Sequence, residues 1–251
     1  MFTIRQEQID AFKPSAVRKF EDDMVDHLKE FAPKRWKTLG EPAVSEVIRF
    51  GMNRARMYGF SYRGPVRFYI ELMFMFGGYF DTDPQHPWAG AVLKDPKMIN
   101  QMIRADRLYK EMNNYLGVVS GPEHKFLIEA MKRLSQSKLE DFVVAGTSLD
   151  RSILATLQRI YPEKCDYLGK TVLGALIQTG VNLARLYQFT SETGMVLTTV
   201  LAFDLGHGFP TDPLYRWIGK ELADKTHPNP NARIDELYSK WKIYLDSLRV
   251  S

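Results

Sequence analysis

Apolar residues recur along this chain at spacings of three and four, which is the pattern of amphipathic helices. The first such segment runs from Val17 to Phe31, and we expect a helix with Ser15 as its N-cap and Pro33 beyond its end. The same pattern, with Asp-Pro and Gly/Pro boundaries, predicts further helices over residues 41–58, 66–76, 84–93, 95–116, 123–136, 139–145, 149–160, 171–187, 194–205, 212–223 and 232–248. Alternation typical of strands does not persist anywhere. The predicted fold class is therefore all-α.

Two segments of the chain have similar sequences. Residues 31–95 align without a gap with residues 160–224, an offset of 129, and 21 of the 65 positions are identical. Unrelated sequences would match at roughly one position in seventeen, so the pattern indicates an internal duplication. We expect a tandem helical repeat packed as a two-fold pseudo-symmetric bundle, with repeat 1 over 1–117 and repeat 2 over 118–251. The short Gly/Ser/Pro-containing stretch 117–122 is the predicted linker.

A Thr-Asp-Pro motif stands in both copies, with its aspartate at Asp83 and Asp212. A tryptophan follows the proline by four residues in each copy, Trp88 and Trp217. An aspartate at an N-cap accepts hydrogen bonds from amides of the first turn, and proline suits the next position. We interpret the motif as a helix start whose tryptophan faces the bundle. The alternative is a surface loop that presents both aspartates to a partner.

A second pair of polar residues is shared by the copies: Asn53 with Arg56, and Asn182 with Arg185. A spacing of three places each pair on one helix face. We expect each arginine to hold the Thr-Asp-Pro aspartate of its own copy through a charge-assisted hydrogen bond. A polar groove on each half that receives a ligand or peptide is the alternative.

Composition narrows the class of protein. The chain of 251 residues has 45% hydrophobic and 25% charged residues and a net charge of +4, divided evenly between the halves, so nucleic-acid binding is not predicted. One cysteine, Cys165, cannot form an internal disulfide, which fits a reducing compartment. No signal peptide or membrane-spanning run is evident. We expect a soluble, cytoplasmic protein.

No motif for catalysis or for a cofactor appears, so no catalytic residue, cofactor or metal site is predicted. Asp81, Asp83 and His86 could ligate a metal, but the second copy lacks two of these three residue types. Asp204 and His207 lie three apart, and neither has a counterpart in the first copy. These differences argue against an ancestral metal site and leave open a site new to one copy.

The segment Phe-Asp-Thr-Asp-Pro-Gln-His-Pro-Trp-Ala at 80–89, with Tyr-Gly-Phe at 58–60 and the runs 20–25 and 48–58, resembles small helical accessory proteins of bacterial type VI secretion gene clusters. The likeness covers about the first 95 residues and the second copy only in part. It implies a non-enzymatic protein that binds another protein, foremost an immunity protein that neutralises a cognate effector. An effector chaperone or adaptor for loading onto the secretion spike is one alternative. A hydrolase-type effector with an unrecognised helical active site is another.

Overall fold

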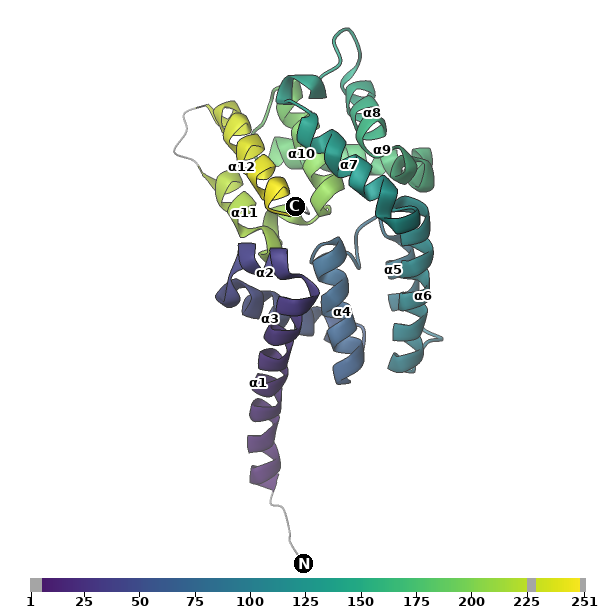
Figure 1. The fold of residues 1–251 in the computed structure, drawn as a ribbon, viewed down its shortest axis with the longest axis vertical. Helices are drawn as coiled ribbons and strands as arrows, with labels where there is room; N and C mark the ends of the chain where they lie inside the picture. Colours follow the sequence, from purple (N-terminus) through teal and green to yellow (C-terminus); the bar gives the residue numbers. More distant parts are fainter. Residues whose placement is uncertain (1–5, 225–228, 249–251) are drawn as a thin grey trace, which may run out of the picture.

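The structure, a computed structural model, describes residues 6–224 and 229–248, with side chains from residue 15 onward. In these ranges every regular element is helical and no strand occurs, so the predicted all-α class is confirmed (Figure 1). The elements are α1 (Gln6–Phe31), α2 (Pro33–Leu39), α3 (Glu41–Met57), α4 (Arg63–Phe76), α5 (Pro87–Leu93), α6 (Gln101–Val119), η1 (Pro122–His124), α7 (Lys125–Gln136), η2 (Leu139–Phe142), α8 (Leu149–Ile160), α9 (Pro162–Leu186), α10 (Glu192–Leu205), η3 (Phe209–Thr211), η4 (Pro213–Tyr215), α11 (Arg216–Ala223), η5 (Pro230–Ala232) and α12 (Arg233–Leu248), where η denotes a 3₁₀ turn.

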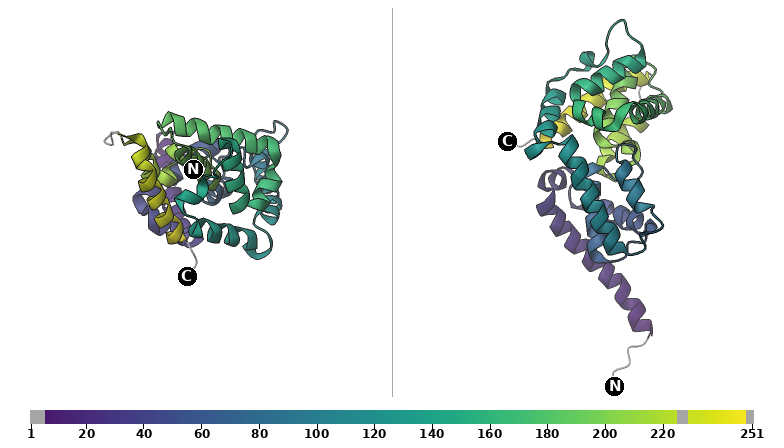
Figure 2. Two further views of the ribbon diagram at one scale, coloured as in Figure 1. Left: turned by 90° about the horizontal axis from the view of Figure 1, so that it is seen from above. Right: turned by 90° about the vertical axis from the view of Figure 1, so that its right-hand side faces the viewer.

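Helix α10 is apolar on nearly all sides and lies in the interior: most of its residues are buried, and α8, α9, α12 and η2 pack around it. The sequence predicted the same for the segment that became α4, but only one face of α4 is buried, and Arg63, Arg67 and Met75 are exposed. Helix α1 instead projects from the body (Figures 1 and 2). No helix in the described ranges has both the length and the apolar character needed to cross a bilayer.

Several element boundaries in the two halves differ by the same 129 residues. Helix α4 ends at Phe76 and α10 at Leu205, and both begin 129 residues apart as well. Helices α3 and α9 end at Met57 and Leu186. The backbone bends at Gly40 before α3 and at the matching residue 169 inside α9, with φ of +76° and +69°.

Several predicted helix starts are wrong. Helix α1 continues through Ser15 instead of beginning there, α5 begins at Pro87, and α6 begins at Gln101. Helix α9 begins at Pro162 instead of 171, and α11 begins at Arg216 instead of 212. Asp83 and Asp95 do accept hydrogen bonds from the amide two residues ahead. Each such bond closes an Asx turn in the loop, and the helix begins a few residues later.

The predicted linker does not separate the halves, because α6 continues through Gly117 to Val119. Helix α6 packs against α9, α12 against α2, and α3 against η4, so each half contacts elements of the other. The buried apolar residues form one continuous core. The cavity described below lies at this junction of the halves.

Candidate functional site

The loops that follow α4 and α10 meet at the junction, and each is held by an aspartate of the other half. Asp83 Oδ2 accepts a hydrogen bond from the backbone amide of His207 at 2.8 Å. Asp212 Oδ2 accepts one from the backbone amide of Gly78 at 2.6 Å. The two interactions are reciprocal, because 83 and 212, and 78 and 207, are both 129 apart. The Thr-Asp-Pro motif therefore joins the halves.

The second oxygen of each aspartate accepts a hydrogen bond from the amide two residues ahead. Asp83 Oδ1 accepts from the amide of Gln85, and Asp212 Oδ1 from the amide of Leu214, both at 2.9 Å. Asp212 thereby caps the short turn η4. Each aspartate is 3% exposed, so neither is presented to a partner at the surface.

Glycine is required where the loops leave the helices. Gly77 and Gly206 have φ of +98° and +97°, a conformation that residues with a Cβ avoid. A Cβ at Gly77 would also lie 2.7 Å from the carbonyl oxygen of Leu205. The loop after α4 can approach the end of α10 this closely because Gly77 has no side chain.

The two aspartates have opposite pKa shifts despite matching backbone contacts. Burial raises the pKa of Asp83, but the His207 ring, whose Nδ1 lies 3.2 Å from Oδ2, together with His86 and the Gln85 amide lowers it to about 2. Burial raises the pKa of Asp212 to about 6, and the backbone amides and distant arginines offset only part of this effect. The residue facing Asp212 is Gly78, which offers an amide and no side chain.

The predicted pairing of Arg56 and Arg185 with these aspartates is wrong. Arg56 donates to Asn53 Oδ1 at 3.3 Å within α3. Asn53, Arg56, Asn182 and Arg185 all lie on exposed helix faces. A spacing of three placed each pair on one face correctly, but it could not say that the face points away from the junction.

The arginine that does bind an aspartate is Arg54, two residues earlier. Its Nη2 lies 2.5 and 2.6 Å from the two oxygens of Asp81, and Tyr58 donates to the same carboxylate at 2.7 Å. The positions 129 residues later are Leu183 and Pro210, so this interaction exists in one half only.

The two motif tryptophans differ in burial. Trp88 is buried among aromatic rings that include Phe76 and Phe80, as predicted. Trp217 is only partly buried and lies against Tyr244. Both tryptophans pack on the core of the protein.

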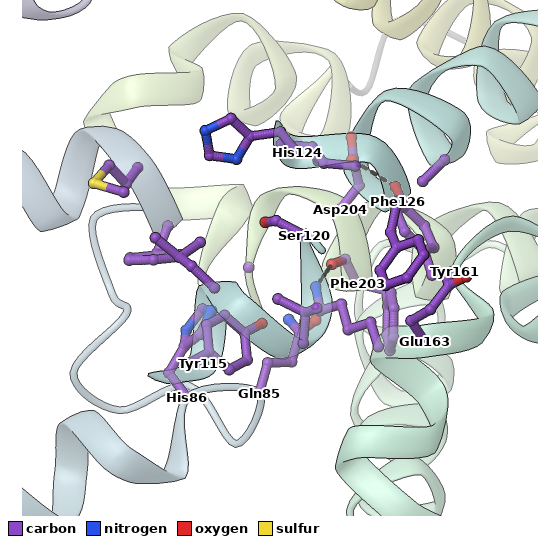
Figure 3. A pocket seen from close by; sticks show the side chains of 18 of the residues that line it. Gln85, His86, Tyr115, Ser120, His124, Phe126, Tyr161, Glu163, Phe203 and Asp204 are labelled. Carbon is purple, nitrogen blue, oxygen red and sulfur yellow. Dashed lines mark hydrogen bonds between the residues drawn. The ribbon is translucent and has the colours of Figure 1, made fainter. Parts of the chain in front are cut away.

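A cavity of about 370 Å³ opens at the junction between the end of α4, α6, α7 and the facing ends of α9 and α10. Figure 3 shows its labelled side chains, with Gln85 and His86 entering from the loop before α5 and Phe203 and Asp204 from α10. Its volume falls in the range of roughly 300–1,000 Å³ that is usual for ligand pockets. Much of the wall is aromatic, formed by Phe76, Tyr115, Phe126, Tyr161 and Phe203.

Two polar side chains of the cavity bind the carboxyl end of α10. Lys164 Nζ donates to the carbonyl of Phe203 at 2.9 Å, and Gln85 Nε2 donates to the carbonyl of Ala202 at 3.0 Å. The last four carbonyls of a helix have no partner within it, and a cation there also suits the helix dipole. Burial lowers the pKa of Lys164 to about 8, while Asp83, Asp204 and Cys165 favour its charged form. The ammonium is therefore mostly charged at neutral pH.

His86 lies beside Lys164 and is uncharged at neutral pH. Burial lowers its pKa to about 4, and the charge of Lys164 acts in the same direction. Its ring packs edge-on against Tyr115, with centroids 5.4 Å apart. Nδ1 of the ring is buried without a partner among the described residues. One nitrogen of a neutral imidazole donates and the other accepts, and Nδ1 is the acceptor when the proton is on Nε2.

Asp204 also lines the cavity, together with Arg35, Ser120, His124 and Glu163, but its oxygens are already occupied. Tyr161 donates its hydroxyl to Oδ1 at 2.7 Å, and Trp241 donates Nε1–H to Oδ2 at 2.9 Å. Burial raises the pKa of Asp204, whereas these hydrogen bonds and the nearby cations Lys164 and Arg35 lower it. The carboxylate ties α12 to α10 and has little capacity left for a ligand.

Outside the cavity, one hydroxyl, one imidazole and one carboxylate stand in the order of a catalytic triad. Thr82 Oγ1 lies 3.5 Å from His207 Nε2, and His207 Nδ1 lies 3.2 Å from Asp83 Oδ2. Thr82 Oγ1 also donates to the carbonyl of Tyr79 at 3.2 Å. The geometry is loose for a nucleophile and base, and the junction cavity is not lined by Thr82 or His207.

The residues considered as metal ligands do not form a site. Asp81 is held by Arg54, while His86 lines the cavity. Across the described residues, no group of three or more His, Cys, Asp or Glu side chains is arranged to hold a metal ion.

The sequence prediction missed Lys164 and Gln85 and considered His86 and Asp204 only as metal ligands. A signal for them was present, because Gln85 and His86 become Leu214 and Tyr215 in the second copy. Such a change from polar to apolar at matched positions marks a place where the halves differ in chemistry. Comparisons of the chain with protein-family models, with curated proteins and with solved structures found no match.

Proposed function

We propose that this chain is a non-enzymatic protein-binding protein of a bacterial type VI secretion gene cluster, acting in the cytoplasm as an immunity protein that binds and neutralises a cognate effector. The observation that carries protein binding is the junction cavity together with its exposed apolar rim. Met75 and Leu127 line the cavity while 36% and 44% exposed. Tyr167, 37% exposed, packs on the cavity residue Tyr115. Exposed apolar groups around a hollow are typical of protein-binding surfaces.

The chemistry of the cavity supports binding over catalysis. Asp204 is occupied by two donors, and His86 is neutral with no hydroxyl or thiol bonded to it. Burial raises the pKa of the only cysteine, Cys165, to about 12, so it is not a thiolate nucleophile. What remains is an apolar wall with a few polar contacts, the composition that suits recognition.

We further propose that the two halves are copies of one helical repeat related by an approximate two-fold axis at the junction. The matched helix boundaries support this, as do the reciprocal contacts of Asp83 and Asp212. An ancestral repeat that paired with a second copy of itself would form the same two contacts across a symmetric interface. Fusion of two such copies keeps the interface inside one chain.

Co-expression with the product of the neighbouring gene tests the immunity role. We expect this protein to restore growth of cells that express the effector and to co-purify with it. Met75→Glu and Leu127→Glu should each abolish rescue, because a charge on the rim cannot be buried against a partner. Ile243→Glu, at an exposed apolar position on α12 (70% exposed), is the matched control and should keep rescue.

The outcomes separate the alternatives. Altered secretion of the effector without growth rescue would indicate the chaperone or adaptor role. Neither rescue nor co-purification with any neighbouring product would refute protein binding.

The Thr82–His207–Asp83 arrangement favours one second candidate, a hydrolase-type effector. A hydroxyl activated by this imidazole would react with a fluorophosphonate probe at Thr82. Labelling that is lost in both Thr82→Ala and His207→Gln would support the hydrolase. Absence of labelling in the folded wild-type protein would leave the binding role alone.

A further inference from the structure

We propose that the junction cavity binds the free carboxyl end of a polypeptide whose last residue is apolar, with the terminal carboxylate on Lys164 and the last peptide N–H on Gln85 and His86. The inference rests on the proposed function, since the chain end belongs to the bound protein. It uses side chains of the cavity that the fold leaves incompletely bonded.

The cation is available to an anion. Lys164 Nζ uses one of its three N–H groups on the Phe203 carbonyl. No carboxylate of the described residues forms an ion pair with it, and both oxygens of the nearby Asp204 are occupied. Two N–H groups can therefore donate to a terminal carboxylate, and such charge-assisted bonds are the stronger kind.

Two buried polar atoms beside this cation lack a partner, Gln85 Oε1 and His86 Nδ1, and the second accepts in the Nε2–H tautomer. Gln85 Nε2 donates to Asp83 and to the Ala202 carbonyl, which fixes the orientation of the amide, and Oε1 is then buried without a partner. Gln85 is 1% exposed and His86, whose Nδ1 also lacks a partner, is 4% exposed. An acceptor buried without a partner is unfavourable, so a ligand donor here would relieve a cost that the free protein bears.

The cation and the acceptors are spaced for a chain end. Lys164 and Gln85 donate to consecutive carbonyls of α10, those of Phe203 and Ala202, so their polar heads lie side by side. In the last residue of a polypeptide, the carboxylate and the N–H are attached to the same Cα atom. That residue thus offers an anion and a donor at neighbouring points, and a simple fatty acid offers the anion alone.

The remaining walls favour an apolar side chain. Phe76, Tyr115 and Phe126 provide an aromatic surface for the last side chain, in a cavity whose volume is about 370 Å³. Glu163 and Arg35 also line the cavity, so the wall carries one further charge of each sign beside Lys164.

Calorimetric titration of the purified full chain tests the inference. The probes are N-acetyl-L-leucine, N-acetyl-L-phenylalanine and their C-terminal amides, which differ only in the terminal charge. We expect the free acids to bind at least about tenfold more tightly than the amides, the factor that corresponds to one charged contact. Equal affinity of acids and amides, or no binding of either up to about 10 mM, would overturn the inference without any need for a variant.

Variants locate the site. Lys164→Met should remove the preference for the acid, whereas Lys170→Met, an exposed lysine on the same helix, should not. Gln85→Leu with His86→Tyr installs the residues found 129 positions later and should abolish binding. Acid binding that survives in this double variant, with helical circular dichroism unchanged, would show that the acids bind elsewhere.

The test also separates this inference from the proposed function. If the effector is neutralised equally well after removal of its last residue, and the acids do not bind, the inference fails and the immunity role stands. Another outcome is that the acids bind although this protein neither restores growth of cells that express a neighbouring gene product nor co-purifies with that product. In that case the cavity takes small acylated amino acids and the immunity role fails.

Discussion

The two sides of the junction are built from positions 129 residues apart and differ in kind. Lys164, His86 and Tyr115 line an open cavity with unfilled hydrogen-bonding atoms. The residues 129 positions away are Arg35, Tyr215 and Tyr244, and of these three only Arg35 also lines the cavity.

The second side is closed by its own side chains. Arg35 Nη1 donates to the Tyr215 hydroxyl at 3.3 Å, and the Tyr215 and Tyr244 rings pack edge-on with centroids 5.9 Å apart. Tyr215 and Leu214 are almost fully buried. A tyrosine reaches the cation where a histidine does not, so the larger side chain fills the space that stays open beside Lys164. One side is filled by its own side chains, and the other contains the cavity.

The aspartates that join the halves show the same contrast in their electrostatics. Their backbone contacts match, yet the pKa of Asp83 is lowered and that of Asp212 is raised. The difference arises from the histidines near Asp83, His207 across the junction and His86 in the same loop, whereas Asp212 faces a glycine. A hydrogen-bonding pattern can thus be common to both halves while the charge around it is set by each half separately.

The largest expected effect on the free energy of unfolding comes from substitution of Asp83, whose ionised form is stabilised by its surroundings. Asp83→Ala leaves the buried amides of Gln85 and His207 without their acceptor, and at about 1–3 kcal/mol for each unsatisfied group we expect a loss of about 3–5 kcal/mol of unfolding free energy at pH 7. Asp212→Ala should cost about 2–3 kcal/mol less, because it also removes a carboxylate whose ionised form is disfavoured by burial. Urea unfolding of both variants measures the difference. Equal losses would contradict the electrostatic contrast.

The next effect is on the pH dependence of stability. The folded pKa of Asp212 is about 6 and its ordinary value is 3.8, so the folded state binds more protons between these values and stability falls as pH rises from about 4 to about 6. At about 1.4 kcal/mol per unit, this fall amounts to about 3 kcal/mol. Asp83, with a pKa of about 2, contributes stability above pH 4 that is lost as pH falls toward 2.

Chemical denaturation across this range checks both signs. Asp212→Asn should remove the decline between pH 4 and 6 and keep the loss at lower pH. Asp83→Asn should do the reverse. A decline between pH 4 and 6 that is unchanged in Asp212→Asn would assign it to another group.

The smallest expected effect on stability comes from Gly51 and Gly180, which are 129 positions apart and lie where helices cross. A Cβ at Gly180 would lie 2.6 Å from the Cα of Thr199, and backbone cannot give way easily. At Gly51 the nearest atoms, 2.7 and 2.8 Å away, are Cγ1 of Ile70 and Sδ of Met73, which are side-chain atoms and not backbone. We expect Gly180→Ala to cost about 1–3 kcal/mol and Gly51→Ala to cost less, since side chains can repack and the gain in helix propensity offsets part of the cost.

Thermal unfolding of the two variants provides the comparison. A larger loss for Gly51→Ala than for Gly180→Ala would mean that the α3–α4 crossing is the less adaptable one.

Apolar spacing and capping residues predicted most helices. They failed where an aspartate closes a turn in a loop instead of starting a helix. Helix α8 has the predicted boundaries, and α3 differs by one residue at its end, because apolar spacing and capping act within a few residues of chain. The Asp-Pro starts at residues 83 and 95 were placed early, because an aspartate can close a loop turn as well as cap a helix. The short helix α2 was not predicted at all.

The sequence by itself determined that this protein is helical, that residues 31–95 and 160–224 share 21 of 65 positions, and that Thr-Asp-Pro holds backbone amides, because these properties follow from periodicity, identity and local capping. Only the tertiary structure decided which half each aspartate also binds, that Arg54 and not Arg56 is the bonded arginine, and that Lys164, Gln85 and His86 share a cavity. Those outcomes depend on contacts between residues more than a hundred positions apart and on which helix face turns inward. Spacing along a chain specifies a face, and the packing of the whole chain decides what that face meets.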